Sequence, residues 1–422
     1  MKEVRVAIIG GGMISHRHMT IYENMRKYAA DLGFTAKVVA VAEIDEAKLK
    51  RWGEQYGFDE KDLYVDFREM LKRDDIDCVD VCVHNNFHTP ISIEVMKRGY
   101  DCYTEKPAAA SYHDAKMMID ASKALGRKFH VQISSIMTPQ SRVARDMIAG
   151  GELGDIYYVN LEAVNRARRP GYDLPMFTTD FYTKKIAGHG MAIDLGIYLI
   201  SQILFITGLP ELESVSGFAK QGMEMNPKLI TDPEGFGVED LADGFAKFKN
   251  GMGFHFLTGA AAHYKDYAMT YVLGSKGGLE IIATDQGGGK LARRGGMAEF
   301  AVPGGMMNPE LIFHGTQGGR DVDIELKCDY NGNIEQRLDP SKLLYNDNQC
   351  MWHAYRLGIL NDETRYNTPE IALRMLQFTD GIFMSQELGR AVTADEIIAN
   401  SPTLYVPEQE IGGELVKFDV EF

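Results

Sequence analysis

The sequence predicts an α/β protein in which a doubly wound parallel sheet is followed by a second α/β domain with a large sheet. Short apolar runs alternate with helical patterns through Ile133, and they give six candidate strands in a βαβα series. A glycine-rich turn, Gly10-Gly11-Gly12, follows the first run. From Leu212 onward the pattern changes to closely spaced strands with hairpin signals such as Asn250-Gly251. We therefore expect two domains, residues 1–133 and residues 134–422.

The composition is that of an ordinary globular protein, and its charge excludes some partners. Of 422 residues, 45% are hydrophobic and 25% are charged, with a formal net charge of -15. An acidic chain is repelled by nucleic-acid backbones and by anionic membranes, so we expect neither as a partner. A small molecule remains the expected ligand.

The cysteines and the N-terminus indicate a cytoplasmic protein. The cysteine count of five is odd, and no two are spaced as a metal-binding pair, so we expect reduced thiols. The apolar run at the N-terminus is too short for a signal peptide and ends in glycines. No stretch of eighteen apolar residues occurs, so we expect no membrane span.

The first strand, Val4 to Ile9, leads into a glycine fingerprint of the kind that holds a dinucleotide. Gly10 permits a tight turn, and Gly12 lets the backbone approach a pyrophosphate at the start of the next helix. The third glycine of the pattern is replaced by Ser15. An ordinary strand-to-helix turn is the alternative reading.

The helix that follows is expected from Met13 to Leu32. Its first residues, Met13 and Ile14, are counted with the cofactor site because the amide end of this helix favours an anion. We expect no metal in this site.

An acidic residue, Glu43, ends the second strand, Ala36 to Ala42. Such a residue reads the diol of a ribose, and it repels a 2'-phosphate, so we favour NAD over NADP. The alternative is that Glu43 caps the helix that begins near Glu46.

The segment Glu105-Lys106-Pro107 follows a short strand and is the strongest candidate for chemistry. Proline forbids helix at Lys106 and allows a cis bond at low cost. The carboxyl end of a strand in an open parallel sheet is where ligands bind. A solvated lysine in a turn is the alternative. The earlier segment from His84 to His88 is expected to be a polar loop, because Pro90 follows, and its two histidines are therefore not expected to share a metal.

A second candidate segment is the apolar stretch Met191 to Leu209, which we expect to form one buried helix. Asp194 and Tyr198 lie four residues apart and so share one face of such a helix. The alternatives are a core carboxylate bonded to backbone and plain core packing of the tyrosine.

Several other segments carry weaker predictions. The basic loop with Arg166, Arg168 and Arg169 either reads substrate hydroxyls or a carboxylate, or is a solvated loop. We expect residues Gly287 to Gly319 to form loops and the tail after Ala399 to be an irregular strap. Helices are expected at Gln349 to Gly358 and at Thr368 to Gly389, the second with an apolar face.

Together these residues resemble the glucose–fructose oxidoreductase, inositol dehydrogenase and rhizopine-catabolism (Gfo/Idh/MocA) family. The resemblance rests on the fingerprint, on Asn85 with His88, on Glu105-Lys106-Pro107 and on Gly188 to Tyr198. It continues through Val238 to Ala242 and to the helix that ends near Arg390, so it spans nearly the whole chain.

The resemblance implies a Rossmann domain followed by an α/β domain with a large, mostly antiparallel, open-faced sheet that packs in homodimers or homotetramers. It implies that Lys106 is the catalytic lysine, that Asp194 binds substrate, and that Tyr198 stands where many members have an acid/base histidine. It also implies that Asn85, His88 and Glu105 line the nicotinamide half of the cofactor. His189 stands where a glycine is common, so we expect it to shape substrate access or to take part itself.

The expected reaction is reversible oxidation of a secondary alcohol on a sugar, cyclitol or related polyol, with hydride transfer to NAD(P). A base must take the hydroxyl proton, and an ammonium beside Tyr198 would lower the pKa of its phenol from the ordinary value of about 10. Two alternatives stay open. One is an NAD-dependent glycosidase or lyase that keeps its cofactor, and the other is a non-catalytic sugar-sensing regulator on the same scaffold.

Overall fold

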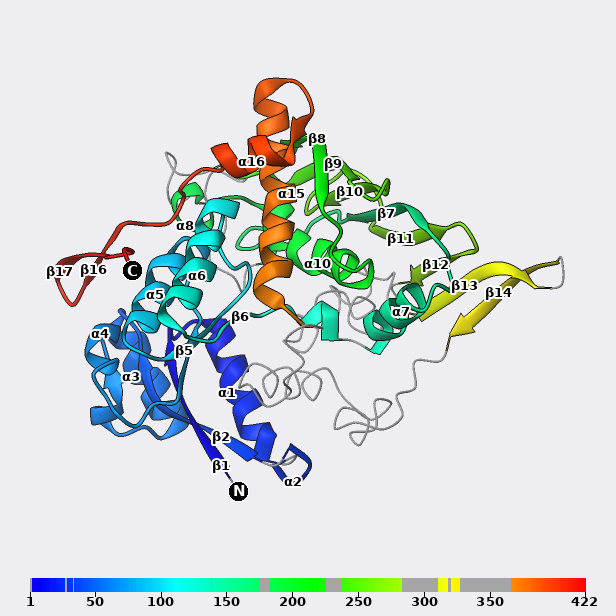
Figure 1. Ribbon diagram of the computed structural model, residues 1–422. Coiled ribbons are helices and arrows are strands. Elements are labelled where there is room, and N and C mark those ends of the chain that lie inside the picture. The colour runs from blue at the N-terminus through cyan, green and yellow to red at the C-terminus, as the bar shows by residue number, and fades with distance from the viewer. Residues whose placement is uncertain are drawn as a thin grey trace. The chain divides into compact units, whose positions relative to one another are not determined.

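The computed structural model describes residues 2–26, 29–32, 34–137, 139–174, 183–224, 237–282, 310–317, 320–326 and 366–422. The described residues form two compact units (Figure 1). The first takes its residues from Met1–Gln132, Tyr330–Pro369 and Thr403–Phe422, and the second from Ile133–Asp329 and Glu370–Pro402.

The first unit is built on a parallel sheet, as predicted. Its six strands, all within the described residues, run in the order β3-β2-β1-β4-β5-β6, and every neighbouring pair is parallel. The order reverses between β1 and β4, and such a reversal is where open α/β sheets bind ligands. The strands are β1 (Lys2–Ile9), β2 (Phe34–Ala42), β3 (Leu63–Tyr64), β4 (Cys78–Val81), β5 (Asp101–Thr104) and β6 (Phe129–Val131).

Helices connect these strands in a doubly wound pattern. They are α1 (Met13–Met25), α2 (Ala29–Leu32), α3 (Glu46–Tyr56), α4 (Phe67–Met70), α5 (Asn85–Lys97) and α6 (Tyr112–Leu125). The single helix predicted over residues 13–32 is two helices, α1 and α2. The core of this unit is apolar and closed, with Ile8, Tyr22, Phe34 and Trp52 each at most 2% exposed.

The prediction of a loop from His84 to His88 was wrong, because α5 begins at Asn85 and contains Pro90. A proline inside a helix leaves the carbonyl four residues earlier without its usual donor. Here that carbonyl belongs to Asn86, and it accepts the backbone N–H of Val406 at 2.9 Å. The C-terminal segment therefore supplies the hydrogen bond that the proline removes.

The C-terminal tail is more regular than predicted. It contains the hairpin β16 (Glu408–Ile411) and β17 (Glu414–Lys417). It is fixed to α6 by Asp114, whose Oδ2 accepts the backbone N–H groups of Leu404 and Tyr405 at 2.8 Å each.

The second unit is built on a nine-stranded sheet, counted over the described residues, in the order β14-β13-β12-β11-β7-β10-β9-β8-β15. All neighbouring pairs are antiparallel except β7 and β10, so the predicted mostly antiparallel sheet is confirmed. Its strands are β7 (Ile156–Val164), β8 (Leu212–Lys220), β9 (Leu241–Phe248), β10 (Gly253–Gly259), β11 (Tyr267–Gly274), β12 (Gly277–Ile282), β13 (Glu310–Gln317), β14 (Arg320–Leu326) and β15 (Val392–Thr393).

Strand β13 lies inside the stretch Gly287 to Gly319 that was predicted as loops, so that prediction was wrong for Glu310–Gln317. The helix predicted at Gln349 to Gly358 lies outside the described residues. The predicted helix at Thr368 to Gly389 is confirmed as α15 (Thr368–Leu388).

One face of this sheet is covered by helices. Phe378 and Ile382 of α15 pack against Gly244 of β9, and Phe378 also contacts Phe254 and Phe256 of β10. The helices of this unit are α7 (Pro139–Ala149), α8 (Lys184–Ala187), α9 (Met191–Asp194), α10 (Gly196–Ile206), α15 and α16 (Ala394–Asn400).

The other face carries exposed apolar side chains. Phe218, Phe245 and Met269 are 38–49% exposed, and the register of β8, β9, β10 and β11 puts all three on this face. Within the described residues these three side chains are partly exposed, and we call this the open face of the sheet.

The prediction of a single helix from Met191 to Leu209 was also wrong. The chain bends between α9 and α10, after Asp194 and before Gly196, and the segments on either side of the break lie at 47° to each other. Asp194 ends one helix and Tyr198 lies in the first turn of the next, so they are not on one face of a continuous helix.

Among the described helices, none alone has the length and apolar character needed to cross a membrane; the bent pair Lys184–Asp194 and Gly196–Ile206 meets that test by length and composition only.

Candidate active site

The glycine turn after β1 has the geometry of a pyrophosphate cradle. Gly10 has a φ of 100°, and a Cβ there would lie 2.4 Å from the carbonyl oxygen of Cys82, so only glycine fits. Gly12 differs, because among the described residues no atom lies within 4 Å of where its Cβ would be. Gly10 therefore provides the tight turn, and Gly12 provides the unobstructed backbone that a dinucleotide needs.

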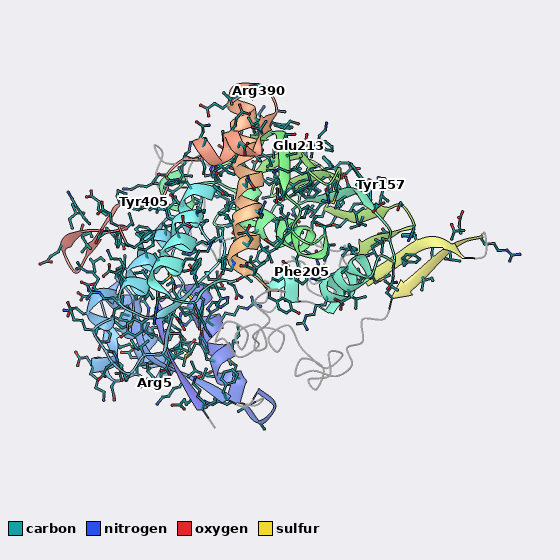
Figure 2. All side chains as sticks on the ribbon, in the orientation of Figure 1. Arg5, Tyr157, Phe205, Glu213, Arg390 and Tyr405 are labelled. Atoms are coloured by element: carbon teal, nitrogen blue, oxygen red, sulfur yellow. The ribbon has the colours of Figure 1, made fainter. Side chains whose placement is uncertain are left out.

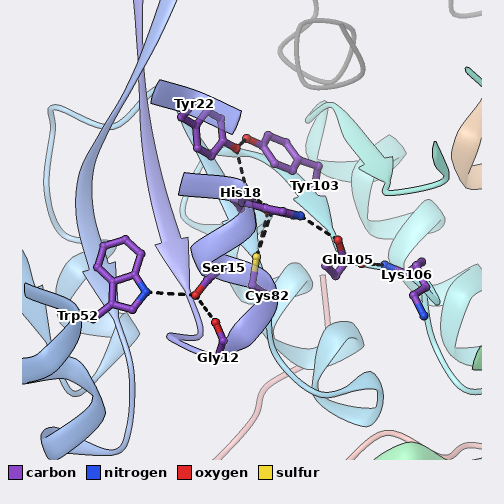
Figure 3. A network of polar contacts seen from close by, with 10 residues as sticks. Gly12, Ser15, His18, Tyr22, Trp52, Cys82, Tyr103, Glu105 and Lys106 are labelled. Atoms are coloured by element: carbon purple, nitrogen blue, oxygen red, sulfur yellow. Dashed lines mark hydrogen bonds and ion pairs between the residues drawn. The ribbon is translucent and has the colours of Figure 1, made fainter. Parts of the chain in front are cut away.

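The departure at the third glycine position has a structural explanation. The buried Ser15 hydroxyl donates to the Gly12 carbonyl at 2.6 Å and accepts from the Trp52 Nε1–H at 3.2 Å (Figure 3). Ser15 thus ties the turn to α1 and to α3. Met13 is 42% exposed at the mouth of this turn, and Ile14 is half-buried against the core.

Glu43 faces the glycine turn and does not cap the next helix. Its Oε2 accepts the Gly11 N–H at 2.7 Å, and its Oε1 accepts the Asp45 N–H at 3.0 Å. The cap of α3 is Asp45, whose side chain accepts the Lys48 N–H. A carboxylate thus stands beside the turn, where an adenosine ribose would lie in this fold.

The strand β5 delivers Glu105, Lys106 and Pro107 to the same edge of the sheet. Glu105 is buried, and its Oε2 accepts the Lys106 backbone N–H at 2.8 Å. Lys106 is half-buried between buried neighbours, and its bond to Pro107 is cis, as the sequence allowed.

His88 fixes the other side of this segment. The ring is fully buried, with Nδ1 2.7 Å from the Pro107 carbonyl oxygen and Nε2 3.0 Å from that of Val83. Burial lowers the pKa of His88, although the carbonyls of Pro107 and Val83 oppose the shift. Asn85, also buried, opens the same helix. His88 therefore contacts the backbone of Pro107, the residue that follows Lys106.

In the second unit, Asp194 and Tyr198 lie on either side of the break between α9 and α10. From Met191 to Ile200 every residue is buried except Asp194, Leu195 and Tyr198, which are half-buried. These three form the accessible stripe of an otherwise apolar segment. Tyr198 is therefore not a fully buried core side chain. Lys106 belongs to the first unit, so its meeting with this pair remains a prediction.

The loop before Asp194 is held by a residue that the sequence reading missed. Glu239 is buried, and its Oε1 accepts the backbone N–H groups of Gly190 at 2.8 Å and Ala192 at 3.1 Å. Burial raises the pKa of Glu239 to about 7, although these hydrogen bonds oppose the shift. Two adjacent acidic residues between apolar ones, in the segment Val238 to Ala242, were the available signal.

This shift makes stability depend on pH. A carboxyl whose pKa is raised on folding stabilises the folded state below its unfolded pKa, and the effect is lost as pH rises through about 7. Glu239→Gln keeps an oxygen acceptor for both N–H groups but does not ionise. We expect this variant to melt like the wild type at pH 4, below the unfolded pKa, and to be more stable than it at pH 8, by up to roughly 3 kcal/mol.

Thermal melts at the two pH values measure this difference. Glu213→Gln is the matched control, because Glu213 is an exposed glutamate on β8 of the same sheet (Figure 2). If Glu213→Gln and Glu239→Gln changed the melting temperature by the same amount at each pH, the role given to Glu239 would be contradicted.

The remaining predicted substrate residues differ in their surroundings. His189 stacks on Phe383 with ring centroids 3.8 Å apart, and burial together with Lys184 lowers its pKa to about 3, so its ring is neutral. Arg166 is exposed, whereas burial lowers the pKa of the half-buried Arg168, an effect that Asp266 opposes.

Arg169 is the structural member of the basic loop. It is buried and forms an ion pair with Asp173 at 2.8 Å. Arg168 is joined to the Glu239 region through backbone, because its N–H donates to the Ala260 carbonyl and the Ala260 N–H donates to the Asp240 carbonyl. Glu239 thus holds the backbone just before Asp194, and the adjacent residue Asp240 is linked through Ala260 to the backbone of Arg168.

The fold and this turn define a dinucleotide-binding protein, since a parallel sheet reverses its order at a glycine turn that has an acidic residue beside it. Residues 4–133 match the model of the oxidoreductase family with an NAD-binding Rossmann fold, and residues 141–280 match the GFO/IDH/MocA C-terminal domain. The chain belongs to the Gfo/Idh/MocA family, and it is an oxidoreductase.

Among characterised relatives, the chain is 28% identical to the D-glucoside 3-dehydrogenase of Escherichia coli over 295 residues, which are 68% of this chain and 80% of that one. It is 24% identical to the levoglucosan dehydrogenase of Pseudarthrobacter phenanthrenivorans over 209 residues, 49% of this chain and 52% of that one. The fold is also similar to solved structures. An NAD-binding oxidoreductase from Klebsiella pneumoniae gives a TM-score of 0.75 at 20% identity, covering 93% of this chain and 99% of that one. A levoglucosan dehydrogenase in complex with NADH gives 0.73 at 19% identity, with the same two coverages.

Proposed function

We propose that this protein oxidises a secondary alcohol of a sugar, cyclitol or related polyol and transfers the hydride to NAD. The observation that carries the proposal is the placement of Lys106, held by Glu105 and Pro107 at the carboxyl edge of a sheet whose glycine turn leaves Gly12 bare. Relatives named for D-glucoside, levoglucosan and inositol dehydrogenation support the substrate class.

In this proposal the nicotinamide cofactor, when bound, supplies the hydride acceptor. Tyr198 takes the hydroxyl proton as the base, and the ammonium of Lys106 favours the phenolate by its charge. Asp194 accepts a hydrogen bond from a substrate hydroxyl and orients the alcohol carbon. Both second-unit residues are half-buried, which suits side chains that contact a ligand.

We propose NAD as the cofactor in preference to NADP. The Glu43 carboxylate already accepts the Gly11 N–H, so it stands at the turn with its charge directed to the adenosine end. A 2'-phosphate there would meet a like charge, and a ribose diol would meet an acceptor.

Arg168 and His189 are proposed as substrate residues, together with the exposed Arg166. A guanidinium that burial has partly desolvated is a strong site for an anionic or hydroxyl-rich group. The neutral ring of His189 offers one donor and one acceptor to a hydroxyl. Sugar acids therefore belong among the candidate substrates.

The assembly and the compartment are also proposals. The open face with Phe218, Phe245 and Met269 suits association of copies into a homodimer or homotetramer. Cys78, Cys82 and Cys102 are buried free thiols, in keeping with a reducing cytoplasm.

The test is an assay of purified protein with sugars, sugar acids and inositols, each with NAD and with NADP. We expect formation of reduced cofactor in step with substrate consumed, and a higher kcat/KM with NAD. Turnover without net NADH would favour the alternative in which an NAD-dependent glycosidase or lyase keeps its cofactor. Sugar binding without any turnover would favour the regulator.

A further inference from the structure

A set of buried polar side chains lies inside the first unit, next to the proposed catalytic lysine, and each member is at most 5% exposed (Figure 3). We call it the His18 network. Its members are His18 and Tyr22 of α1, Asp80 of β4 with Cys82 just after it, and Tyr103 of β5 with Glu105 just after it.

His18 stands at the centre, between two carboxylates. Its Nδ1 is 2.7 Å from Asp80 Oδ2, and its Nε2 is 2.9 Å from Glu105 Oε1. An imidazole ring donates from both nitrogens only when it is protonated. With both distances in hydrogen-bond range, the geometry fits an imidazolium.

The groups around the ring are consistent with this charge. Asp80 also accepts from the Tyr22 hydroxyl at 2.8 Å, and Tyr22 contacts the Tyr103 hydroxyl. The Cys82 sulfur is 3.3 Å from His18 Nδ1. Burial opposes a charged ring, but Asp80 and its neighbours hold the pKa of His18 well above the ordinary value.

A metal ion is the competing explanation, since ligand atoms of His18, Asp80 and Cys82 lie within 4.8 Å of one another. Nitrogen and oxygen ligands of one tetrahedral zinc are roughly 3.3 Å apart, given bonds of about 2.0 Å each. The separation of His18 Nδ1 from Asp80 Oδ2 is 2.7 Å, which is a hydrogen-bond distance and shorter than that expected for two ligands of a tetrahedral zinc.

Glu105 connects this network to Lys106. One carboxylate oxygen, Oε1, faces His18, and the other, Oε2, accepts the Lys106 backbone N–H at 2.8 Å. A buried carboxylate without a cation would take up a proton. The His18 imidazolium favours the ionised form of Glu105, and an ionised carboxylate accepts the Lys106 N–H more strongly than a neutral carboxyl group does.

We propose that His18 is a positioning residue, a buried imidazolium that keeps Glu105 ionised and thereby fixes the backbone of Lys106. The inference rests on the proposed function only in taking Lys106 as catalytic. His18 touches neither substrate nor cofactor in this account, and it acts through Glu105. The Asp80 carboxylate of β4, the His18 imidazolium and the Glu105 carboxylate after β5 thus alternate in charge.

The first experiment observes the charge directly and does not depend on activity. ¹⁵N-histidine NMR of the whole protein is followed from pH 5.5 to 9, and the His18 signals are assigned by their loss in His18→Gln. We expect both ring nitrogens to keep imidazolium shifts throughout, whereas an ordinary imidazole in water loses its proton at about 6.5. A neutral His18 ring at pH 7, or a stoichiometric metal ion lost in the variant, overturns the proposal.

The second experiment measures the consequence for Lys106. His18→Gln keeps an amide donor near Glu105 but removes the charge. We expect kcat to fall roughly 10- to 100-fold with the dissociation constant for NAD nearly unchanged. Because Glu105 without the imidazolium then ionises only at higher pH, the ratio of wild-type to variant kcat should shrink as pH rises. A purely structural role would not produce this pH dependence.

His16→Gln is the matched control. His16 lies on the same helix, but its Nδ1 faces the Tyr56 hydroxyl at 2.9 Å, away from Glu105. We expect this variant to keep kcat and its pH profile. If His18→Gln does not fold, the double variant with Glu105→Gln, which pairs two neutral amides, should melt higher than the single variant. A double variant no more stable than the single one overturns the proposal, as does an unchanged kcat in a folded His18→Gln.

The two hypotheses fail in different ways. If Lys106→Met retains turnover, the proposed function fails while the NMR result for His18 stands. If His18 titrates like an exposed histidine while Lys106→Met is inactive, the positioning role alone fails.

Discussion

Lys106→Met should bind NAD as the wild type does and turn over at least roughly 10³-fold more slowly. Methionine keeps the length and the apolar stem of lysine, so the cis turn at Pro107 and its contact with His88 are retained. What is removed is the ammonium, and with it the charge that favours a phenolate at Tyr198. Steady-state kinetics on the best substrate from the screen and fluorescence titration with NAD measure the two quantities.

Lys116→Met is the control for the loss of a lysine in the same unit. Lys116 forms an i,i+4 ion pair with Asp120 on α6, and the two side chains are 44% and 42% exposed. Exposed pairs of this kind contribute little to stability, so we expect unchanged turnover. If Lys106→Met retained turnover within about twofold of the wild type, the assignment of Lys106 would be lost.

The pairing of Lys106 with Tyr198 has its own consequence. If the two act as one base, Tyr198→Phe should cost nearly as much as Lys106→Met, and the double variant little more than either. Additive losses would mean that the two residues act in separate steps. This measurement tests whether Lys106 and Tyr198, which belong to different compact units, act together.

The parallel sheet could be predicted because its signals are local. The run Val4 to Ile9 is apolar and continuous, as a strand buried on both faces requires, and the glycines follow at once. The same holds for the segment that carries Lys106, since Pro107 restricts the residue before it. Periodicity and turn chemistry suffice where one segment determines its own shape.

The helix α5 and the break after Asp194 could not be predicted in the same way. Pro90 argues against a helix until Val406, from the far end of the chain, supplies a donor to Asn86. The stretch from Met191 onward is apolar nearly all round, so its pattern gives no direction for a bend. In both places a distant contact decides the local structure.

The His18 network left a signal that the sequence reading passed over. Asp80 lies in the middle of an apolar run, and a buried carboxylate needs a partner. The pattern shows that a partner must exist but does not identify it. His18 precedes Asp80 by 62 residues, and only the pairing of β1 with β4 brings their elements together.

Two alanine substitutions in the glycine turn should separate folding from cofactor binding. Gly12→Ala places its Cβ in open space, so we expect an unchanged melting temperature. The added methyl group stands where the backbone must approach a pyrophosphate, and we expect the affinity for NAD to fall roughly 10-fold or more. Gly10→Ala instead forces a side chain into a φ of 100° and against the Cys82 carbonyl oxygen.

For Gly10→Ala we expect a loss of about 2 kcal/mol or more in the free energy of unfolding, visible as a lower melting temperature. Differential scanning fluorimetry and NAD titration of both variants give the comparison. If Gly12→Ala bound NAD as tightly as the wild type, the turn would not be the pyrophosphate site, whatever the fold. The contrast is informative because the two glycines are two residues apart and share one turn, but they differ in φ and in what a methyl group would meet there.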